Sequence, residues 1–317
     1  MTGLAHLVPA RAARELSRRS LWGHVPGRPA PAGGRPPGPP TLALSFDLDY
    51  RADTEALGPL CELLGDLDVR ATMFCIGRLA QDDPAPYAAA AAAGHEIANH
   101  TMTHPDNPVL NPDREFWDLT QAEMEAEIGA AQDALEAATG ERPTGFRSPH
   151  FKDAWPLRAA LAASPEITYL SSTLATRGPS ALPYVPARAP AHGRLSLAFP
   201  APDPRPGDAL MIPLTACPGV RWSPFSSYLS IREPANPAKG AGIHGLSRFE
   251  ALWARMLAAE SARGFASVYF DPMDVMRDAE ARAAFARMLE RALAEGWALL
   301  PLREVGARWR PVVTGAA

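Results

Sequence analysis

The sequence predicts an α/β protein folded as a distorted (β/α) barrel of about seven strands, most of them parallel. The first reason is that short apolar runs alternate with helix-forming segments from residue 41 to residue 300. The second is that polar, chemically reactive residues repeatedly follow the apolar runs, and barrel enzymes place their active sites at the carboxyl ends of the strands. The chain has 317 residues, which is enough for one such domain, since about 250 residues make a barrel.

Strands are predicted where a short apolar run lies between turn-forming residues. In chain order the predicted strands are residues 42–46, 71–76, 95–99, 145–147, 167–170, 209–214, 266–270 and 297–300. Helices are predicted where apolar residues recur with helical spacing or where alanines are dense. The predicted helices are residues 53–67, 86–93, 120–139, 154–163, 246–263 and 278–294.

The predicted helix over residues 120–139 has the clearest boundaries. Thr120 and Glu123 have the spacing of a capping box, and Gly140 is suited to end the helix. In the helix predicted to follow the first strand, Asp53 is a candidate N-cap.

Three stretches fall outside this alternation. Residues 1–40, basic at first and then rich in Pro and Gly, are expected to be a lead-in. The barrel domain is therefore expected to span residues 41–310, with a tail at 311–317. Residues 176–208 are dense in proline, and a second irregular stretch runs over 215–245. Long loops in a compact domain are usually functional or disordered.

Composition narrows the class of protein. The formal net charge of -4 argues against nucleic acid as the main partner. The cysteines, Cys61, Cys75 and Cys217, form no CxxC pair, so neither a zinc knuckle nor a disulfide framework is indicated. No run of about 18 apolar residues is present, so no membrane span is expected, and the basic start lacks the apolar region of a secretory signal. We therefore expect a cytoplasmic protein, and the sequence leaves a homo-oligomer open.

Two carboxylates end the first predicted strand. Asp47 and Asp49 are two residues apart, so on a strand they lie on one face. Two carboxylates on one buried face are unfavourable unless a metal or another cation neutralises them.

A histidine pair follows the third predicted strand. His100 and His104 are four residues apart, so on a helical turn both rings can reach one ion. With Asp49 they would form a two-histidine, one-carboxylate set that leaves open positions, as catalytic metal sites do. Asp47 would then remain beside the metal to accept a proton. His95, earlier on the same strand, is expected to be a buried structural histidine.

Two further residues are expected at the same end of the barrel. Arg147 ends the fourth predicted strand and Asp271 follows the seventh. The convergence of these side chains with the Asp and His residues from several strands is the main argument for a catalytic site.

These residues resemble the motifs of the polysaccharide deacetylases of carbohydrate esterase family four, also called the nodulation-deacetylase homology domain. Residues 46–49 (Phe-Asp-Leu-Asp) are similar to the first motif, and residues 95–105 resemble the second. Residues 146–149 (Phe-Arg-Ser-Pro) resemble the third motif, and residues 71–77 resemble the second strand of the family with its glycine. The resemblance covers roughly residues 41–305.

The resemblance implies a distorted (β/α) barrel and metal-dependent hydrolysis of an N-acetyl group on a sugar or glycoconjugate. It implies that one divalent metal ion, most commonly zinc, is held by Asp49, His100 and His104. It also implies that Asp47 is the general base and that Arg147 contacts Asp47 and sets its charge and orientation.

The third motif supplies the expected substrate contacts, which are Ser148, Pro149 and His150. For His150 an exposed loop position without a role is an equally good interpretation.

The sequence departs from the family pattern at two places. The last motif usually supplies a histidine as the general acid, and Asp271 stands there. An Asp is an acid near neutral pH only if burial or another carboxylate raises its pKa. Three interpretations stay open: Asp271 is the acid, His150 or His244 replaces it, or the protein is weakly active or inactive. The Asp and Trp of the fourth motif are also absent, and residues 169–172 occupy that region.

Two other functions are compatible with the sequence. Hydrolysis of another non-peptide C–N bond, in a cyclic imide or ureide, demands less of a leaving-group acid, and cytosolic members with the Phe-Asp-x-Asp variant include such enzymes. A non-catalytic, metal-containing carbohydrate-binding protein would account for Asp271. The expected partner is a carbohydrate or another small amide-bearing molecule.

Overall fold

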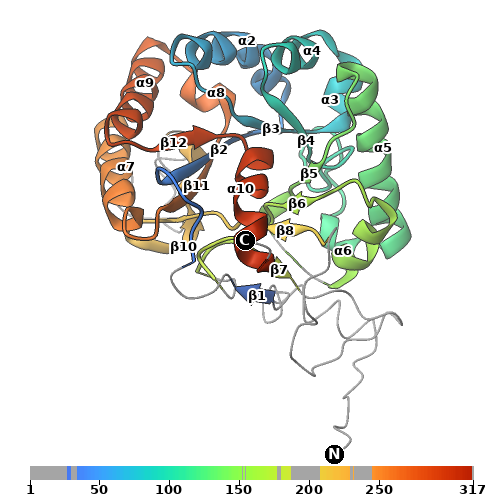
Figure 1. Cartoon of the computed structure of the whole chain (residues 1–317). Helices are drawn as coiled ribbons and strands as arrows, with labels where there is room; N and C mark the ends of the chain where they lie inside the picture. Colours follow the sequence, from blue (N-terminus) through green and yellow to red (C-terminus); the bar gives the residue numbers. More distant parts are fainter. Residues whose placement is uncertain are drawn as a thin grey trace, which may run out of the picture.

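The computed structural model describes residues 27–29, 34–151, 153, 155–176, 180–186, 208–228, 231 and 245–315. In these ranges a curled sheet occupies the middle of the molecule and helices surround it on the outside (Figure 1). No helix in the described ranges is both long enough and apolar enough to cross a membrane.

The main sheet of the described residues has ten strands. In sheet order these are β1 (Gly27–Pro29), β7 (Tyr184–Pro186), β8 (Leu210–Met211), β6 (Tyr169–Leu170), β5 (Gly145–Phe146), β4 (Glu96–Asn99), β3 (Thr72–Cys75), β2 (Thr41–Leu48) and β11 (Phe265–Phe270), with β12 (Ala298–Leu300) paired to β2. All neighbours from β11 to β8 are parallel, whereas β7 and β1 are antiparallel. A separate hairpin contains β9 (Ala216–Cys217) and β10 (Val220–Pro224). The predicted mainly parallel α/β barrel is confirmed as a curled half-barrel.

Helices connect most of the parallel strands. In chain order they are α2 (Arg51–Asp66), α3 (Gly77–Asp82), α4 (Ala85–Ala92), α5 (Gln121–Thr139), α6 (Trp155–Ala160), α7 (Leu246–Glu260), α8 (Pro272–Val275), α9 (Ala279–Ala294) and α10 (Leu302–Thr314). Short 3₁₀ segments lie at Phe116–Asp118, Pro149–Phe151 and Leu161–Ala163.

The predicted boundaries of α5 are confirmed in atomic detail. Thr120 Oγ1 accepts from the main-chain N–H of Glu123, whose carboxylate accepts from the N–H of Thr120 at 2.6 Å. Gly140 follows with φ of 80°, a left-handed conformation in which a side chain would be strained. The prediction for α2 is wrong in one respect: the helix begins at Arg51, so Asp53 is inside its first turn rather than at the N-cap.

Strand β2 pairs with three strands, β3, β11 and β12, and all eight of its residues are buried. On one side of the sheet, Phe46 contacts Phe270 and Phe285, with ring centroids 6.1 and 5.9 Å away. Phe285 comes from α9, so this aromatic cluster attaches an outer helix to the strand that ends at the site.

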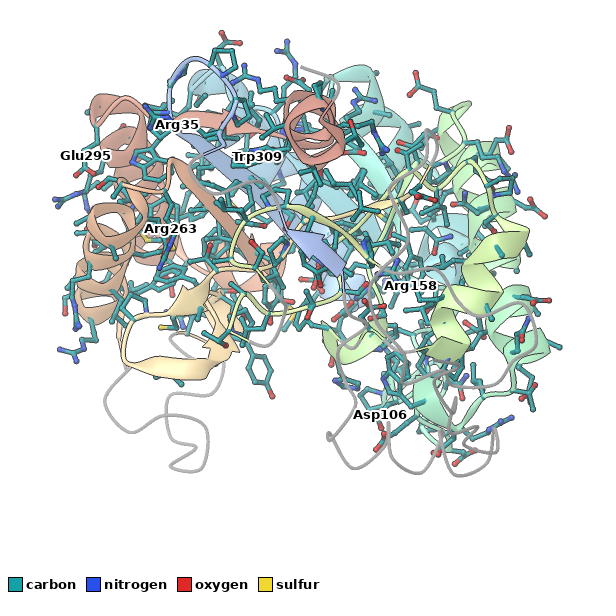
Figure 2. The ribbon with its side chains drawn as sticks, turned by 60° about the horizontal axis from the view of Figure 1, so that its bottom comes forward. Arg35, Asp106, Arg158, Arg263, Glu295 and Trp309 are labelled. Atoms are coloured by element: carbon teal, nitrogen blue, oxygen red, sulfur yellow. The ribbon has the colours of Figure 1, made fainter. Side chains whose placement is uncertain are left out.

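Helix α10 closes one end of the half-barrel. Leu302 and Trp309 belong to a buried cluster with Phe74 of β3, and the N–H of Leu302 donates to Thr72 Oγ1 at 2.7 Å. Figure 2 shows Trp309 near the top of the view and Asp106, in the loop that follows β4, near the bottom. The loops at the carboxyl ends of the strands therefore lie opposite α10.

Several elements were not predicted from the sequence. These are α3, α8, α10, β1, β7 and the β9–β10 hairpin. Helix α10 runs through residue 310 to Thr314, so the segment expected as a tail begins as helix. Strand β1 pairs with β7, so structure precedes residue 41. The remaining residues of the expected lead-in before residue 27 lie outside the described residues.

Candidate active site

The candidate site is assembled at the carboxyl ends of neighbouring strands. Asp47 is the penultimate residue of β2, and Asp49 follows that strand directly. His100 follows β4 and Arg147 follows β5. Because β2, β3, β4 and β5 pair in parallel, these ends lie along one edge of the sheet.

Asp49, His100 and His104 come together as the sequence predicts. Each offers one ligand atom, and these atoms all lie within 4.8 Å of one another. His100 Nε2 is 3.4 Å from Asp49 Oδ1. The rings of His100 and His104 meet edge to face with centroids 4.9 Å apart. Among the described residues this is the group of acidic, His or Cys side chains with the spacing of a metal site.

The polar atoms of this cluster fit a metal ion. Within the described part of the chain, Asp49 Oδ1 and His104 Nδ1 are buried without a hydrogen-bond partner. Nδ1 of His100 donates to the carbonyl of Arg147 at 2.8 Å, which leaves the Nε2 lone pair facing Asp49. Burial lowers the pKa of His100 to about 3, so the ring is neutral. Two imidazoles and a carboxylate are a ligand set suited to zinc.

The two histidines do not lie on a helical turn, so that part of the prediction is wrong. Residues 100–104 are irregular, and Thr101 and His104 have φ of 69° and 47°. Thr101 Oγ1 accepts from the N–H of His104 at 3.0 Å, and Asn99 Oδ1 accepts from the N–H of Thr101 at 2.8 Å. Side-chain oxygens therefore replace helical hydrogen bonds, and a tight turn brings the rings together.

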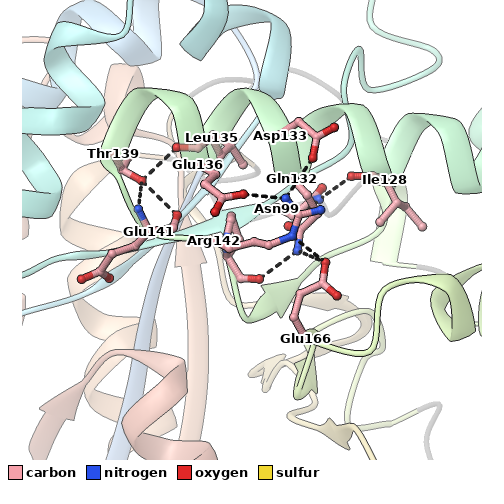
Figure 3. A network of polar contacts seen from close by, with 11 residues as sticks. Asn99, Ile128, Gln132, Asp133, Leu135, Glu136, Thr139, Glu141, Arg142 and Glu166 are labelled. Carbon is pink, nitrogen blue, oxygen red and sulfur yellow. Dashed lines mark hydrogen bonds and ion pairs between the residues drawn. The ribbon is translucent and has the colours of Figure 1, made fainter.

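Helix α5 contacts Asn99, the residue before this turn (Figure 3), and also contacts Thr103 within it. Asn99 Nδ2 donates to the carbonyl of Ile128 at 2.9 Å and to Gln132 Oε1 at 3.0 Å. The carboxylate of Glu127 accepts from both the N–H and the hydroxyl of Thr103 at 2.9 Å. The long predicted helix thus has a direct part in placing the histidine pair.

Arg147 and Asp47 form a buried ion pair, as the resemblance implies. Arg147 is 0% and Asp47 2% exposed, and Nη1 donates to Asp47 Oδ1. Nη2 donates to Ser45 Oγ and Ser171 Oγ, both at 2.9 Å. The guanidinium also lies over the ring of Phe74, 3.9 Å from its centroid. These contacts fix the orientation of both charged groups.

The charge of Asp47 depends on two opposing effects. Burial raises the pKa of Asp47, and the positive charge of Arg147 opposes that rise. Arg147 therefore supports the ionised form of Asp47, which is the form that can accept a proton.

Asp271 directly follows β11, which is a neighbour of β2 in the sheet, as β3 is. Phe270 of β11 pairs with Phe46 of β2, so Asp271 and Asp47 are neighbours in strand register. Asp271 is 2% exposed. Ser227 Oγ is 3.4 Å from Asp271 Oδ2 and accepts from the N–H of Asp271 at 3.0 Å. A carboxyl group therefore occupies the strand end where the family pattern has a histidine.

Of residues 148–150, only His150 is exposed. Its Nε2 is 3.1 Å from Asp106 Oδ2, and its ring centroid is 5.6 Å from that of His104. His150 thus stands at the rim of the metal-ligand cluster. His244, the other histidine considered as an acid, lies outside the described residues.

Residues with strained backbone conformations are concentrated near the Asp49–His100–His104 cluster. Among the described non-glycine residues with positive φ, most lie in the two loops that follow β4 and β5: Thr101, His104, Asp106, His150 and Phe151. Such conformations cost about 1–3 kcal/mol each and are commonly found at functional sites.

Three aromatic side chains of the site were not predicted from the sequence. Phe74, Phe151 and Tyr269 surround the guanidinium of Arg147, with centroids 3.9, 5.5 and 5.5 Å from it. Burial raises the pKa of Tyr269 well above its ordinary value, so its hydroxyl stays protonated. Strand alternation offered a signal, since Tyr269 on β11 is two residues before Asp271, which directly follows that strand.

The model of the polysaccharide deacetylase family matches residues 34–163 of this chain. That region includes Asp47, the three candidate metal ligands and Arg147.

The curated relatives are matched over less than half of their own length. A chitooligosaccharide deacetylase of Sinorhizobium fredii is 41% identical over 70 residues, which are 22% of this chain and 31% of that protein. A chitooligosaccharide deacetylase of Rhizobium leguminosarum bv. trifolii is 34% identical over 91 residues, 29% of this chain and 39% of that protein.

Similar solved structures extend over nearly the whole chain. A structure described as a polysaccharide deacetylase of Mycobacterium smegmatis has a TM-score of 0.68 and 18% identity, and covers 90% of this chain and 94% of its own. Puue allantoinase has a TM-score of 0.64 and 17% identity, with 89% of this chain and 96% of its own covered. At these identities the likeness concerns the fold alone.

Proposed function

We propose that this protein is a metal-dependent hydrolase that removes an N-acetyl group from an N-acetylated sugar or glycoconjugate. The observation that carries the proposal is the position of the Asp49–His100–His104 cluster beside the Asp47–Arg147 ion pair. Such an arrangement combines a metal site with a buried proton acceptor, which amide hydrolysis requires. The chitooligosaccharide deacetylases among the relatives support a sugar substrate.

The residues of the site have separate tasks in this proposal. A divalent ion held by Asp49, His100 and His104, with zinc the proposed metal, supplies Lewis-acid chemistry by polarising the amide carbonyl and acidifying a water. Asp47 accepts the proton of the attacking water. Arg147 keeps Asp47 ionised and fixed in place, so little reorganisation accompanies the proton transfer.

The leaving amine needs a proton, which a positioned acid can supply. We assign this role to Asp271, because it is buried and adjacent to Asp47 in strand register. His150 is the second candidate, because it lies at the rim of the cluster beside His104.

A second candidate function is hydrolysis of another non-peptide C–N bond, such as that of a cyclic ureide. The observation that favours it is the carboxyl group of Asp271 at the position of the usual histidine. A ureide nitrogen is stabilised by its neighbouring carbonyl as it leaves, so it demands less proton donation than a sugar amine.

The experiment measures acetate release from chitooligosaccharides and other N-acetylated sugars, with zinc and again with a chelator. Release that requires metal and is lost in Asp47→Asn supports the deacetylase. Ring opening of a cyclic ureide without acetate release would favour the second function. Sugar binding without either reaction would contradict both and indicate a non-catalytic binding protein.

The cytoplasmic location expected from the sequence stays a prediction. Fractionation of cells that contain the full-length chain tests it.

A further inference from the structure

A buried carboxylate outside the candidate ligand set connects two loops of the site. Asp53 of α2 is 0% exposed. Its Oδ2 accepts hydrogen bonds from the main-chain N–H groups of Asp49 at 3.1 Å and Tyr50 at 3.0 Å. Its Oδ1 accepts from the main-chain N–H of Met273 at 3.1 Å. One side chain therefore bridges the turn that carries Asp49 and the turn that follows Asp271.

The main chain of Asp49 is held on its other side by Asn107. This side chain is buried, and its Nδ2 donates to the carbonyl of Asp49 at 2.8 Å. The N–H of Asn107 donates to the carbonyl of His104 at 2.7 Å. The anchor for Asp49 is therefore part of the loop that carries another candidate ligand.

We propose that Asp53 and Asn107 are positioning residues for the candidate metal ligand Asp49, and that Asp53 also sets the place of Asp271 relative to the metal cluster. The N–H and the carbonyl of Asp49 are each fixed by one of these side chains. The main chain of Asp49 is therefore held in place on both sides, which limits the positions that its carboxylate can take. Partners that orient metal ligands in this way commonly change metal affinity about 10- to 100-fold when removed. The part that concerns Asp271 rests on the proposed function.

Asp53 makes more contacts than are needed to cap the N-terminus of α2. Its bond with the N–H of Tyr50 is the usual contact of a carboxylate in a first turn. The bond to Met273 comes from a segment 220 residues later in the chain, in α8, which lies beside α2 (Figure 1). The N-terminus of α2 does not require the bond to Met273. That bond is needed only to hold the turn that carries Asp49 and the turn that follows Asp271 in a fixed relation to each other.

The test compares Asp53→Asn with Asp278→Asn in the full-length protein. Asp278 is a matched control because its carboxylate accepts from the N–H of Ala281 at 2.8 Å at the start of α9. Calorimetric zinc titration gives the metal Kd, and thermal unfolding without metal gives the structural effect. We expect both variants to lower the unfolding temperature and only Asp53→Asn to weaken zinc binding, by about tenfold or more. An unchanged zinc Kd in Asp53→Asn would overturn the inference.

A second variant covers the case in which Asp53→Asn does not fold. Asn107 lies in a loop rather than in a helix or strand, and Asn107→Ala removes the other anchor of Asp49. This variant is also expected to weaken zinc binding about tenfold. A wild-type zinc Kd in Asn107→Ala would overturn the role of this residue.

The catalytic part of the inference has its own readout. With the substrate that the wild-type protein hydrolyses, Asp53→Asn is expected to lower kcat at saturating zinc more than it changes KM. A wild-type kcat under these conditions would overturn the link to Asp271. Absence of hydrolysis by the wild-type protein would contradict the proposed function, and the zinc titration would still decide the metal part. A wild-type protein that binds no zinc would overturn the inference.

Discussion

The guanidinium of Arg147 and the carboxylate of Asp47 form an ion pair in which both side chains are buried. Arg147 also donates to Ser45 on β2 and to Ser171 after β6. The same group therefore supports the charge of the candidate base and ties together the ends of three strands. The stability of the fold and the charge of the candidate base therefore both depend on Arg147.

Replacement of Arg147 by methionine is expected to destabilise the fold strongly. The change leaves the carboxylate of Asp47 buried without its partner, and breaking a buried pair in this way costs about 3–5 kcal/mol. Denaturant unfolding of Arg147→Met and of the wild-type protein measures the difference in the free energy of unfolding.

Arg142→Met is the control for this measurement. Arg142 contacts Asp133, Glu136 and Glu166 at 2.6–3.0 Å (Figure 3), but its side chain is 37% exposed. Solvent screens such contacts, so the expected loss is within about 1 kcal/mol. An equal loss in the two variants would contradict the special role of burial at Arg147.

Removal of one metal ligand should abolish stabilisation by zinc. Zinc that binds the folded but not the unfolded protein stabilises the folded state and so raises the unfolding temperature, by an amount that increases with the logarithm of the zinc concentration above the Kd. In His100→Ala this rise should disappear, because His100 supplies one of the candidate ligand atoms. The control His95→Gln, at the opposite end of β4, should retain it. Thermal unfolding with zinc and with a chelator measures both, and a full zinc shift in His100→Ala would exclude this site.

The assignment of the general acid predicts a substrate-dependent defect. Asp271→Asn should lower kcat for an N-acetylated sugar by about 100-fold or more, since the amine then leaves without a proton. Hydrolysis of nitrophenyl acetate should change much less, because a nitrophenolate leaves readily without protonation. His150→Gln should not show this contrast. If His150→Gln shows it and Asp271→Asn does not, His150 is the acid.

The sequence predicts the strands of the site well and its loops poorly. The runs that form β2, β3 and β4 are apolar and lie between turn residues, so local pattern and burial indicate the same structure. The turn at His100 and His104 depends on Thr101 and Asn99 side chains, which local spacing does not reveal. The prediction that these histidines meet Asp49 is confirmed, but the predicted helical turn is wrong.

Long-range contacts explain the other failures. Asp53 has the spacing of a helix start, and nothing near it in the sequence indicates its bond to Met273. Helix α10 is a different case: it follows β12 directly, and its buried residues Leu302, Val305 and Trp309 recur with helical spacing, a local signal that the sequence prediction did not use.

The pH dependence of stability should include a contribution from His95. This residue is buried, and its Nδ1 accepts from the N–H of Ala71 at 3.3 Å. Burial, with a smaller effect of Arg70, lowers the pKa of His95 to about 4. In the unfolded chain the pKa is about 6.5, so between these values the unfolded state binds more protons. Stability from this residue is therefore complete above about pH 6.5 and is lost as the pH falls toward about 4, by up to about 3 kcal/mol.

The variant His95→Gln isolates this contribution. A glutamine oxygen can accept from the N–H of Ala71 but does not titrate, so the variant should lose less stability than the wild-type protein between pH 7 and pH 5. Denaturant unfolding at several pH values in chelator measures both slopes, and His100 titrates equally in the two proteins. The expected difference in slope approaches about 1.4 kcal/mol per pH unit below pH 6, where the unfolded histidine is mostly protonated. Parallel pH profiles would show that His95 gains its proton in the folded state as readily as in the unfolded chain.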